Sequence, residues 1–349
     1  MIDIDGSYGE GGGQVLRTSL TLSVLTGRAV KIENIRARRP KSGLAAQHLT
    51  AVRAAAAISG ATVSGDQMGS RKLIFEPGGP PRAGAYSFDV AQVRGAGSAG
   101  AVSLVLQTIF LPLALAEGDS QVTLRGGTHV AWSPSVPYLT EVYVPACAKL
   151  GLHATLELTR WGFYPAGGGE IVAQIRGGAT DIYPLSLMER GALARVWGVA
   201  VVSNLPAHIP QRMANRARNV LAQVGLKVDI QAQRVRSNGP GAGIFILTES
   251  ENGSRAGFTA YGRKGLPAER VAEAACQDLI AHHRNRAPVD RHLADQLILP
   301  LTWASGPSRF ATCRVTEHLR TNVWIVERFG QAQFEITGNM IAIAPKIQR

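Results

Sequence analysis

The chain has 349 residues, of which 45% are hydrophobic and 18% charged, so it can bury a sizeable core and is not globally disordered. Its formal net charge of +12 favours polyanionic partners, chiefly nucleic acid, although proteins without such partners can also be basic. The cysteines Cys147, Cys276 and Cys313 are far apart and form no CxxC pair, which indicates neither a zinc site nor a disulfide framework and suits a reducing cytoplasm.

The N-terminal part of the chain alternates strands with helices. In chain order we expect a strand at 2–4 leading into a glycine loop, a helix over 15–27 that ends at a C-cap glycine, a strand over 29–37, an Ala-rich helix over 42–60 with Ser42 as its cap, and short strands and turns over 61–93. This alternation predicts a mixed α/β fold.

The most apolar segment of the chain comes next. GAGSAG at 95–100 opens a helix over 101–116, which is too short for an ordinary membrane span and contains Gln107. We therefore expect a buried helix and no membrane partner. It is followed by a predicted strand over 120–127, a helix over 137–150 and a strand over 152–162.

Two glycine-rich loops resemble each other. SYGEGGGQ at 7–14 and FYPAGGGE at 163–170 both combine an aromatic residue, a short gap, three glycines and a polar residue. Each lies near an alternation of strand and helix, which suggests an internally duplicated α/β unit.

The character of the sequence changes over 182–285. The segments ARVWGVAVVSNLP and GAGIFILTES are predicted strands around an Arg- and Gln-rich helix, and 267–285 is a helix with apolar residues at a spacing of about 3.6. This part is predicted to be an inserted or second domain. After it we expect helices over 292–306 and over 316–330, the latter capped by Thr316, and a closing strand or hairpin over 334–345.

The first glycine loop could bind an anion. Backbone N–H groups of Gly11, Gly12 and Gly13 at a helix start attract phosphate, and Arg17 could add positive charge. Glu10 would repel phosphate unless a divalent metal bridges the two. A purely structural turn is the alternative, because neither GxGxxG at the required spacing nor GxxxxGK[ST] occurs.

Basic residues also gather in IRARRPKSGLAAQH. Arg36, Arg38, Arg39 and Lys41 precede a helix that carries Gln47, and the planar guanidinium group suits phosphate. The alternative is a solvated basic turn.

His318 is the strongest candidate for a nucleophile or base. It lies in the first turn of the helix capped by Thr316, where the helix dipole disfavours protonation of the imidazole. A neutral imidazole can act as a nucleophile. A further polar group, His292, Asp295 and Gln296, lies in another apolar helix and could stack on a base or hold a ribose or metal.

Six segments occur in an order that resembles the RNA 3′-terminal phosphate cyclase family. They are DGSYGEGGGQVLRTSLTLS, IRARRPKSGLAAQHLTAV, GSAGAVSLVLQT, GFYPAGGGE, HLADQLILPL and EHLRTNVWIVERF, and together they span about residues 3 to 340.

The resemblance implies an ATP-dependent reaction. ATP adenylylates a histidine with release of pyrophosphate, AMP passes to the 3′-phosphate of an RNA, and the 2′-hydroxyl then forms a 2′,3′-cyclic phosphate and releases AMP. The family uses Mg²⁺ or Mn²⁺. The partners implied are therefore ATP and RNA with a 3′-phosphate end. The oligomeric state is left open, with a homodimer as one alternative, and the cytoplasmic location is the one that the cysteines indicate.

The resemblance also implies roles for individual residues. His318 matches the histidine nucleophile and Glu10 the metal-associated glutamate. The phosphate side is implied to comprise the loop glycines with Gln14, Arg17, Arg36, Arg39 and Gln47, and the nucleotide side to comprise Gln107, His292, Asp295, Gln296 and Pro134.

Three positions depart from the family pattern. His292 stands where some members have a tyrosine that stacks on adenine, and Pro134 is the candidate for the opposite side of that base. Arg38 stands where a small residue is frequent, and the loop GGTHVAWSPSVPY at 126–138 is unusual. The nucleotide preference is therefore open.

The fold implied by the resemblance is a large domain of repeated βαβαββ-like units, which resemble the C-terminal domain of a translation initiation factor, with a smaller α/β insert. We predict the main domain over 1–181 and 286–349 and the insert over 182–285.

Four other functions are alternatives to this one. A non-catalytic ribosome-assembly member of the same superfamily lacks the histidine, whereas His318 is present in HLRTN. An enolpyruvyl transferase has a related fold and would turn over phosphoenolpyruvate. A lysine-nucleophile ligase needs a KxDG signature, which is absent, and a plain RNA-binding module would not consume ATP.

Overall fold

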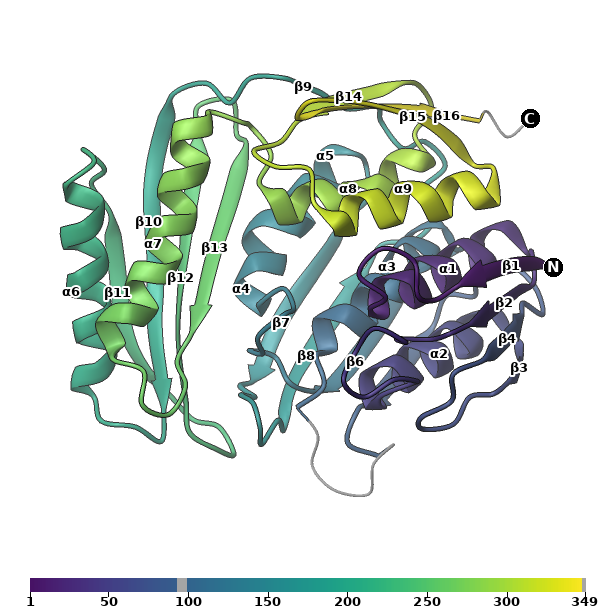
Figure 1. Cartoon of the computed structure of the whole chain (residues 1–349), viewed down its shortest axis with the longest axis horizontal. Coiled ribbons are helices and arrows are strands. Elements are labelled where there is room, and N and C mark those ends of the chain that lie inside the picture. Colours follow the sequence, from purple (N-terminus) through teal and green to yellow (C-terminus); the bar gives the residue numbers. More distant parts are fainter. Residues whose placement is uncertain (93–98, 347–349) are drawn as a thin grey trace.

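The computed structural model describes residues 1–92 and 99–346, and it begins with a compact α/β unit (Figure 1). Its elements are β1 (Ile2–Asp5), α1 (Gly13–Thr26), β2 (Val30–Glu33), α2 (Ala46–Ser59), β3 (Thr62–Ser64) and β4 (Leu73–Glu76). The sheet order is β1-β2-β4-β3, in which β1 and β2 are parallel and the other neighbours antiparallel. The unit is therefore βαβαββ in chain order.

A second unit repeats this topology. It contains β5 (Ala85–Asp89), α3 (Val102–Leu115), β6 (Ser120–Gly126), the helical segments α4 (Val136–Tyr138), η1 (Leu139–Tyr143) and α5 (Val144–Lys149), and the strands β7 (Ala154–Arg160) and β8 (Gly169–Ile175). The sheet order β5-β6-β8-β7 again has one parallel pair followed by two antiparallel pairs.

A third unit has the same topology but is interrupted. Its elements are β9 (Ser186–Leu187), α8 (Arg291–Thr302), β14 (Ser308–Ala311), α9 (Glu317–Phe329), β15 (Ala332–Thr337) and β16 (Met340–Pro345). β9 is parallel to β14, and β14 and β15 are both antiparallel to β16. The predicted mixed α/β fold with repeated βαβαββ-like units is confirmed.

The interruption lies between β9 and α8 and forms its own sheet with two helices. Its elements are β10 (Leu193–Ser203), α6 (His208–Ala222), β11 (Asp229–Val235), β12 (Gly241–Ser250), β13 (Arg255–Tyr261) and α7 (Ala268–Asn285). A separate hydrophobic cluster joins α6 and α7 to this sheet, on the left of Figure 1. The insert boundaries at 182 and 285 remain a prediction, and the pairing of β9 with β14 favours a start after Leu187.

The two glycine-rich loops do not occupy equivalent positions in the repeated units, although their likeness in sequence suggested the repeat. The loop at 7–12 joins β1 to α1, whereas the loop at 163–168 joins β7 to β8, so the two occupy different positions in their units. The counterpart of the first loop connects β5 to α3, and most of GAGSAG at 95–100 lies outside the described residues. The repeat is conserved in topology rather than in loop sequence.

Most predicted helix ends are confirmed, with one wrong cap. Gly27 ends α1 in the left-handed conformation, and the Thr316 side chain accepts a hydrogen bond from Leu319 N at 3.1 Å. Ser42 does not cap α2, because the helix starts at Ala46 after the extended residue Ala45. The helix predicted over 292–306 is α8, which starts one residue earlier, ends at Thr302 and is capped by Asp290.

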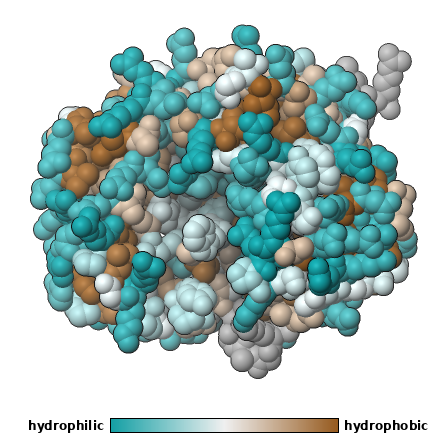
Figure 2. All heavy atoms as spheres, in the orientation of Figure 1, coloured by the Kyte–Doolittle hydropathy of each residue, from teal (hydrophilic) through white to brown (hydrophobic). Residues whose placement is uncertain are grey.

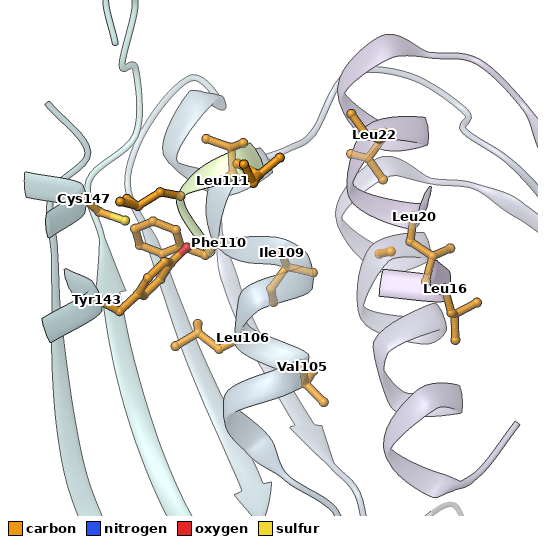
Figure 3. Packing of buried hydrophobic residues seen from close by; sticks show 14 of the residues in the cluster. Leu16, Leu20, Leu22, Val105, Leu106, Ile109, Phe110, Leu111, Tyr143 and Cys147 are labelled. Carbon is orange, nitrogen blue, oxygen red and sulfur yellow. The ribbon is translucent and has the colours of Figure 1, made fainter. Parts of the chain in front are cut away.

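The main core lies between the helices of different units. Figure 3 shows α3 between α1 and the segment that carries Tyr143 and Cys147, with Leu106 and Phe110 facing that segment. The rings of Phe110 and Tyr143 meet edge to face at 5.5 Å. The apolar segment at 101–116 is therefore the buried helix that was predicted, with residues such as Val105 and Ile109 fully buried.

Candidate functional site

Glu10 lies between a histidine and an arginine that are far apart in sequence. Its Oε2 is 3.3 Å from His318 Nε2 and 3.1 Å from Arg39 Nη2. All three side chains are partly open to solvent, with exposed fractions of 38 to 42%. The first glycine loop and the start of α9 thus form one partly exposed polar site.

Aromatic stacking holds the glycine loop on α9. The Tyr8 and Trp324 rings stack at 3.9 Å and 9°. Gly9 has φ +60°, and a Cβ there would collide with Thr321 Oγ1. This close approach brings Glu10 to the first turn of α9, where His318 lies.

The surroundings of His318 favour its neutral form. Its pKa is lowered chiefly by burial, and the positive charges of Arg17 and Arg39 add to the effect. Glu10 opposes this shift. A neutral imidazole is the state in which a histidine can act as a nucleophile.

A hydrogen-bond network connects α1, α8 and α9. Gln14 Nε2 donates to Thr18 Oγ1 at 3.0 Å and to Asn322 Oδ1 at 2.9 Å, and Arg17 Nη2 donates to Gln14 Oε1 at 2.7 Å. Asn322 Nδ2 donates to the backbone oxygen of Asp295 at 2.8 Å. The predicted residues Gln14, Arg17 and Asp295 are therefore held by shared partners.

Thr18 and Asn322 are partners that the sequence analysis missed. Both side chains are buried, and Thr18 Oγ1 donates to Asn322 Oδ1 at 2.6 Å. Asn322 follows His318 by four residues, which places both on one face of α9. That spacing was the available signal.

Arg17 and Asp295 are half-buried ionisable residues near each other. Burial lowers the pKa of Arg17 to about 10, and the nearby Asp295 opposes that shift. Burial also raises the pKa of Asp295 well above its usual range, and Asp290 adds to it while Arg17 opposes it. The centre of the site is thus a low-dielectric environment in which a bound ion interacts strongly.

A cavity of about 40 Å³ adjoins this network. Its lining includes Arg17 and Asp295 together with two amides, Gln107 and Gln296. Among the described residues, Gln107 Nε2 and Gln296 Oε1 are buried without a hydrogen-bond partner. A larger hollow of about 540 Å³ lies over β14 and β16 and contains none of the predicted site residues.

The glycine run is packed against side chains of the basic segment and of α2. Gly11 has φ +56°, and a Cβ there would lie 2.9 Å from Arg38 Cβ. A Cβ on Gly13 would collide with His48 Nε2, whose ring is buried. The pKa of His48 is well below its usual range because of burial and of nearby arginines, first Arg17. The glycines therefore allow these side chains to approach the loop closely.

Two predicted phosphate ligands make structural hydrogen bonds. Arg36 Nη1 donates to Gly43 O at 2.8 Å, and Arg36 itself has φ +53°. Gln47 Oε1 accepts from Ala101 N at 2.9 Å, so it joins α2 to the start of α3. These contacts fix loops around the site.

His292 contacts Tyr138, and Pro134 precedes the residue that caps the helix carrying Tyr138. His292 is exposed at the start of α8, and its ring meets that of Tyr138 edge to face at 6.5 Å. Pro134 precedes Ser135, which caps α4 by accepting from Tyr138 N at 3.2 Å. The contacts of His292 and Pro134 with adenine remain a prediction.

The donor set fits a metal that is shared with phosphates. Within residues 1–92 and 99–346, no group of three or more His, Cys, Asp or Glu side chains could hold an ion. Mg²⁺ commonly binds through one or two carboxylates and substrate phosphates, and the partly exposed Glu10 carboxylate provides one such ligand. The same described residues contain no helix with the length and hydropathy of a membrane span.

Comparison with known proteins places the chain beside one family. The family model described as RNA 3′-terminal phosphate cyclase matches residues 8–336. The chain is 55% identical over 346 residues to the RNA 3′-terminal phosphate cyclase of Trichormus variabilis, covering 99% of both chains. It is 42% identical over 338 residues to that of Pyrobaculum aerophilum, covering 95% of this chain and 94% of the relative.

One solved structure is also similar in part. The enolpyruvyl transferase NikO from Streptomyces tendae aligns with 95% of this chain and 80% of its own at 12% identity. Its TM-score of 0.22 is too low to support a conclusion about fold or function.

Proposed function

Because the chain belongs to the RNA 3′-terminal phosphate cyclase family and is an enzyme of that kind, we propose that it acts through a covalent histidyl-AMP at His318. The main support is the position of His318, whose Nε2 is 3.3 Å from Glu10 Oε2 and whose pKa is lowered. ATP and an RNA with a 3′-phosphate end are the proposed substrates.

The first step forms a phosphorus–nitrogen bond. The neutral His318 imidazole attacks the α-phosphorus of ATP, and the bond to the pyrophosphate oxygen breaks. Arg17 and Arg39, which act electrostatically on His318, would stabilise the charge of the phosphates. Glu10 would hold Mg²⁺ or Mn²⁺, which when bound supplies positive charge between carboxylate and phosphates.

The next two steps transfer AMP and close the ring. An oxygen of the RNA 3′-phosphate attacks the AMP phosphorus and breaks its bond to His318. The adjacent 2′-hydroxyl then loses its proton and attacks the 3′-phosphate, forming the 2′,3′-cyclic phosphate and releasing AMP. The guanidinium groups of Arg17 and Arg39, with the backbone amides of the glycine loop, would offset the repulsion between the two substrates' phosphates.

The nucleotide would lie towards α8. Gln107 and Gln296 offer buried polar atoms beside Asp295, and His292 and Pro134 would contact the two faces of adenine. The cytoplasmic location stays a prediction from the cysteine content, and a homodimer stays one alternative for the oligomeric state.

The test is covalent labelling without RNA. Wild type, His318→Ala and the exposed-histidine control His208→Ala would be incubated with ATP labelled on the α-phosphate and Mg²⁺, then denatured and run on a gel. We expect an acid-labile label on wild type and on His208→Ala alone. Equal label on His318→Ala would mean another nucleophile.

The same assay separates the alternatives. No label on any variant, with ATP binding confirmed, would favour a non-catalytic ribosome-assembly role, or an enolpyruvyl transferase if phosphoenolpyruvate is turned over. For the second half of the reaction, RNA carrying a 3′-phosphate should become resistant to phosphatase in the presence of ATP.

A further inference from the structure

Trp132 is an exposed aromatic residue that the proposed reaction steps do not use. Its side chain is 99% exposed, and its φ is +66°. A bulky residue rarely adopts the left-handed conformation, and a hydrated indole gives up the burial that usually stabilises aromatic residues. Both features disfavour tryptophan at this position on grounds of folding alone.

The loop that carries Trp132 is firmly held at its base. Thr128 N and His129 N both donate to Gly162 O, at 2.9 and 3.0 Å. The His129 ring stacks on Trp161 at 4.3 Å, and Ser133 Oγ donates to Val130 O at 2.9 Å. The indole is thus an exposed flat surface on a fixed base.

This loop connects the two sides of the candidate site. On one side, Val130 packs with Ala101, whose N–H donates to Gln47. On the other side, Tyr138 donates through its hydroxyl to Asp290 Oδ1 at 2.9 Å, and Asp290 caps the helix α8 that carries the nucleotide-side residues. The loop that carries Trp132 therefore runs between these two sides.

The surroundings of the loop are suited to a nucleic acid. Trp161 pairs with Ser237 of the insert, so the exposed residues Arg160 and Arg236 flank the same seam. Figure 2 shows this face of the molecule hollowed between the part with α6 and α7 and the part with α1 and α9. A flat apolar ring on a loop whose base contacts this basic seam matches an unpaired base on a phosphate backbone.

We propose that Trp132 is a stacking platform for an unpaired base of the RNA, upstream of its 3′-terminal nucleotide. The proposal rests on the proposed function, because that function places an RNA 3′ end in the adjoining site. The aromatic ring would position the RNA and take no part in the chemistry. Adenine of ATP is the other base that the ring could stack on, and the two sources can be told apart.

The test combines removal of the Trp132 ring with removal of single bases of the RNA. RNA oligonucleotides with a 3′-phosphate and one abasic position, moved stepwise upstream from the 3′ end, would be cyclised by wild type, Trp132→Ala and Trp132→Phe. Base–aromatic stacking corresponds to a loss of about 5- to 150-fold per base. We expect kcat/KM to fall by that factor for wild type at one abasic position. Trp132→Ala should lose the same factor on intact RNA. The abasic RNA should cause no further loss in Trp132→Ala.

Controls separate the RNA from ATP and from folding. Trp132→Phe should recover most of the activity, and Tyr183→Ala, which removes another ring that is 55% exposed, should behave as wild type. Labelling by ATP without RNA should be unchanged in Trp132→Ala. A drop in that labelling, or equal sensitivity of wild type and Trp132→Ala to every abasic position, would overturn the proposal.

A measurement of RNA binding tests the proposal without relying on the cyclisation reaction. Fluorescence anisotropy of a labelled RNA with a 3′-phosphate should report weaker binding by Trp132→Ala than by wild type, with recovery in Trp132→Phe. If wild type forms no label with ATP, the proposed function fails while this measurement still decides the stacking. Equal affinities of wild type and Trp132→Ala would refute it.

Discussion

At the scale of single residues, the effect of Glu10 on the pKa of His318 opposes the effects of burial and of the arginines. Its carboxylate favours the protonated form of His318, whereas burial and the nearby arginines favour the neutral form. The direction of the net shift indicates that burial and the arginines prevail. Glu10 also contacts Arg39, so its carboxylate interacts with both Arg39 and His318.

The pH dependence of His318 adenylylation follows from these effects. Because the pKa of His318 lies below the usual 6.5, the imidazole stays neutral and reactive as the pH falls to that value. We expect the acid limb of the RNA-independent labelling rate to have its midpoint below 6.5. A midpoint above 6.5 would contradict this account.

Glu10→Gln tests the opposing charge. Removing the carboxylate removes the interaction that raises the pKa of His318, so the acid midpoint should move to still lower pH. The labelling rate at neutral pH should also fall, because the proposed metal ligand is lost. The measurement is the same pH profile, and an upward shift of its midpoint would be evidence against the assigned interaction.

Asn322 should matter for stability and for the site together. Asn322→Ala removes the acceptor of Thr18 and Gln14 and the donor to Asp295 O, leaving buried polar atoms unpaired. We expect a loss of about 1 to 3 kcal/mol in the free energy of unfolding and a lower labelling rate. Urea denaturation and the gel assay measure the two effects. The exposed Asn215→Ala in α6 should change neither by a comparable amount, and a wild-type-like Asn322→Ala would exclude the network.

At the scale of elements, the site is built from equivalent helices of the three units. α1, α3 and α8 each follow the first strand of a unit, and they contribute Arg17, Gln107 and Asp295 to one cavity. α9 adds Asn322 to the lining of that cavity and carries His318 in its first turn. The repeat thus brings similar helices together while the residues on them differ.

The caps of two helices provide a matched comparison. Thr316→Ala removes the hydrogen bond from Leu319 N that starts α9, and we expect a loss of about 1 kcal/mol and slower labelling of His318. Ser42→Ala should leave both unchanged, because Ser42 lies outside α2. Thermal or urea unfolding measures the first effect. Similar losses in both variants would show that the cap assignment is mistaken.

At the scale of the whole molecule, buried histidines connect stability to pH. Burial lowers the pKa of His129 to about 3 and that of His282 to about 4. The pKa of each histidine is lower in the folded state than the unfolded value of about 6.5. Above pH 6.5 the histidine is neutral in both states and does not reduce stability. Below pH 6.5 the unfolded state takes up a proton, so the free energy of unfolding falls until the pH reaches the folded pKa. His129 alone accounts for about 2 kcal/mol between pH 7 and 5.

We therefore expect the urea midpoint of the wild type to fall between pH 7 and pH 5. His129→Gln should lower the midpoint at pH 7, because its ring stacks on Trp161, but should reduce the dependence on pH. The exposed-histidine variant His153→Gln should keep the wild-type dependence. An unchanged dependence in His129→Gln would mean that other groups cause the acid sensitivity.

The sequence by itself determined the local elements and the chemical candidates. Periodicity and capping residues specified α1 and α9, since Gly27 and Thr316 act within a few residues of themselves. The family resemblance predicted the repeated units, and the position of His318 in a first turn indicated a neutral imidazole. These features depend on short-range geometry, which sequence patterns record directly.

The tertiary structure alone decided which residues meet. The repeat is visible in strand pairing rather than in the two glycine-rich loops, because topology depends on contacts between distant segments. Thr18 and Asn322 gain their roles from a hydrogen bond that spans 304 positions. Likewise, the exposure of Trp132 depends on how its loop is anchored, and no local pattern encodes that anchoring.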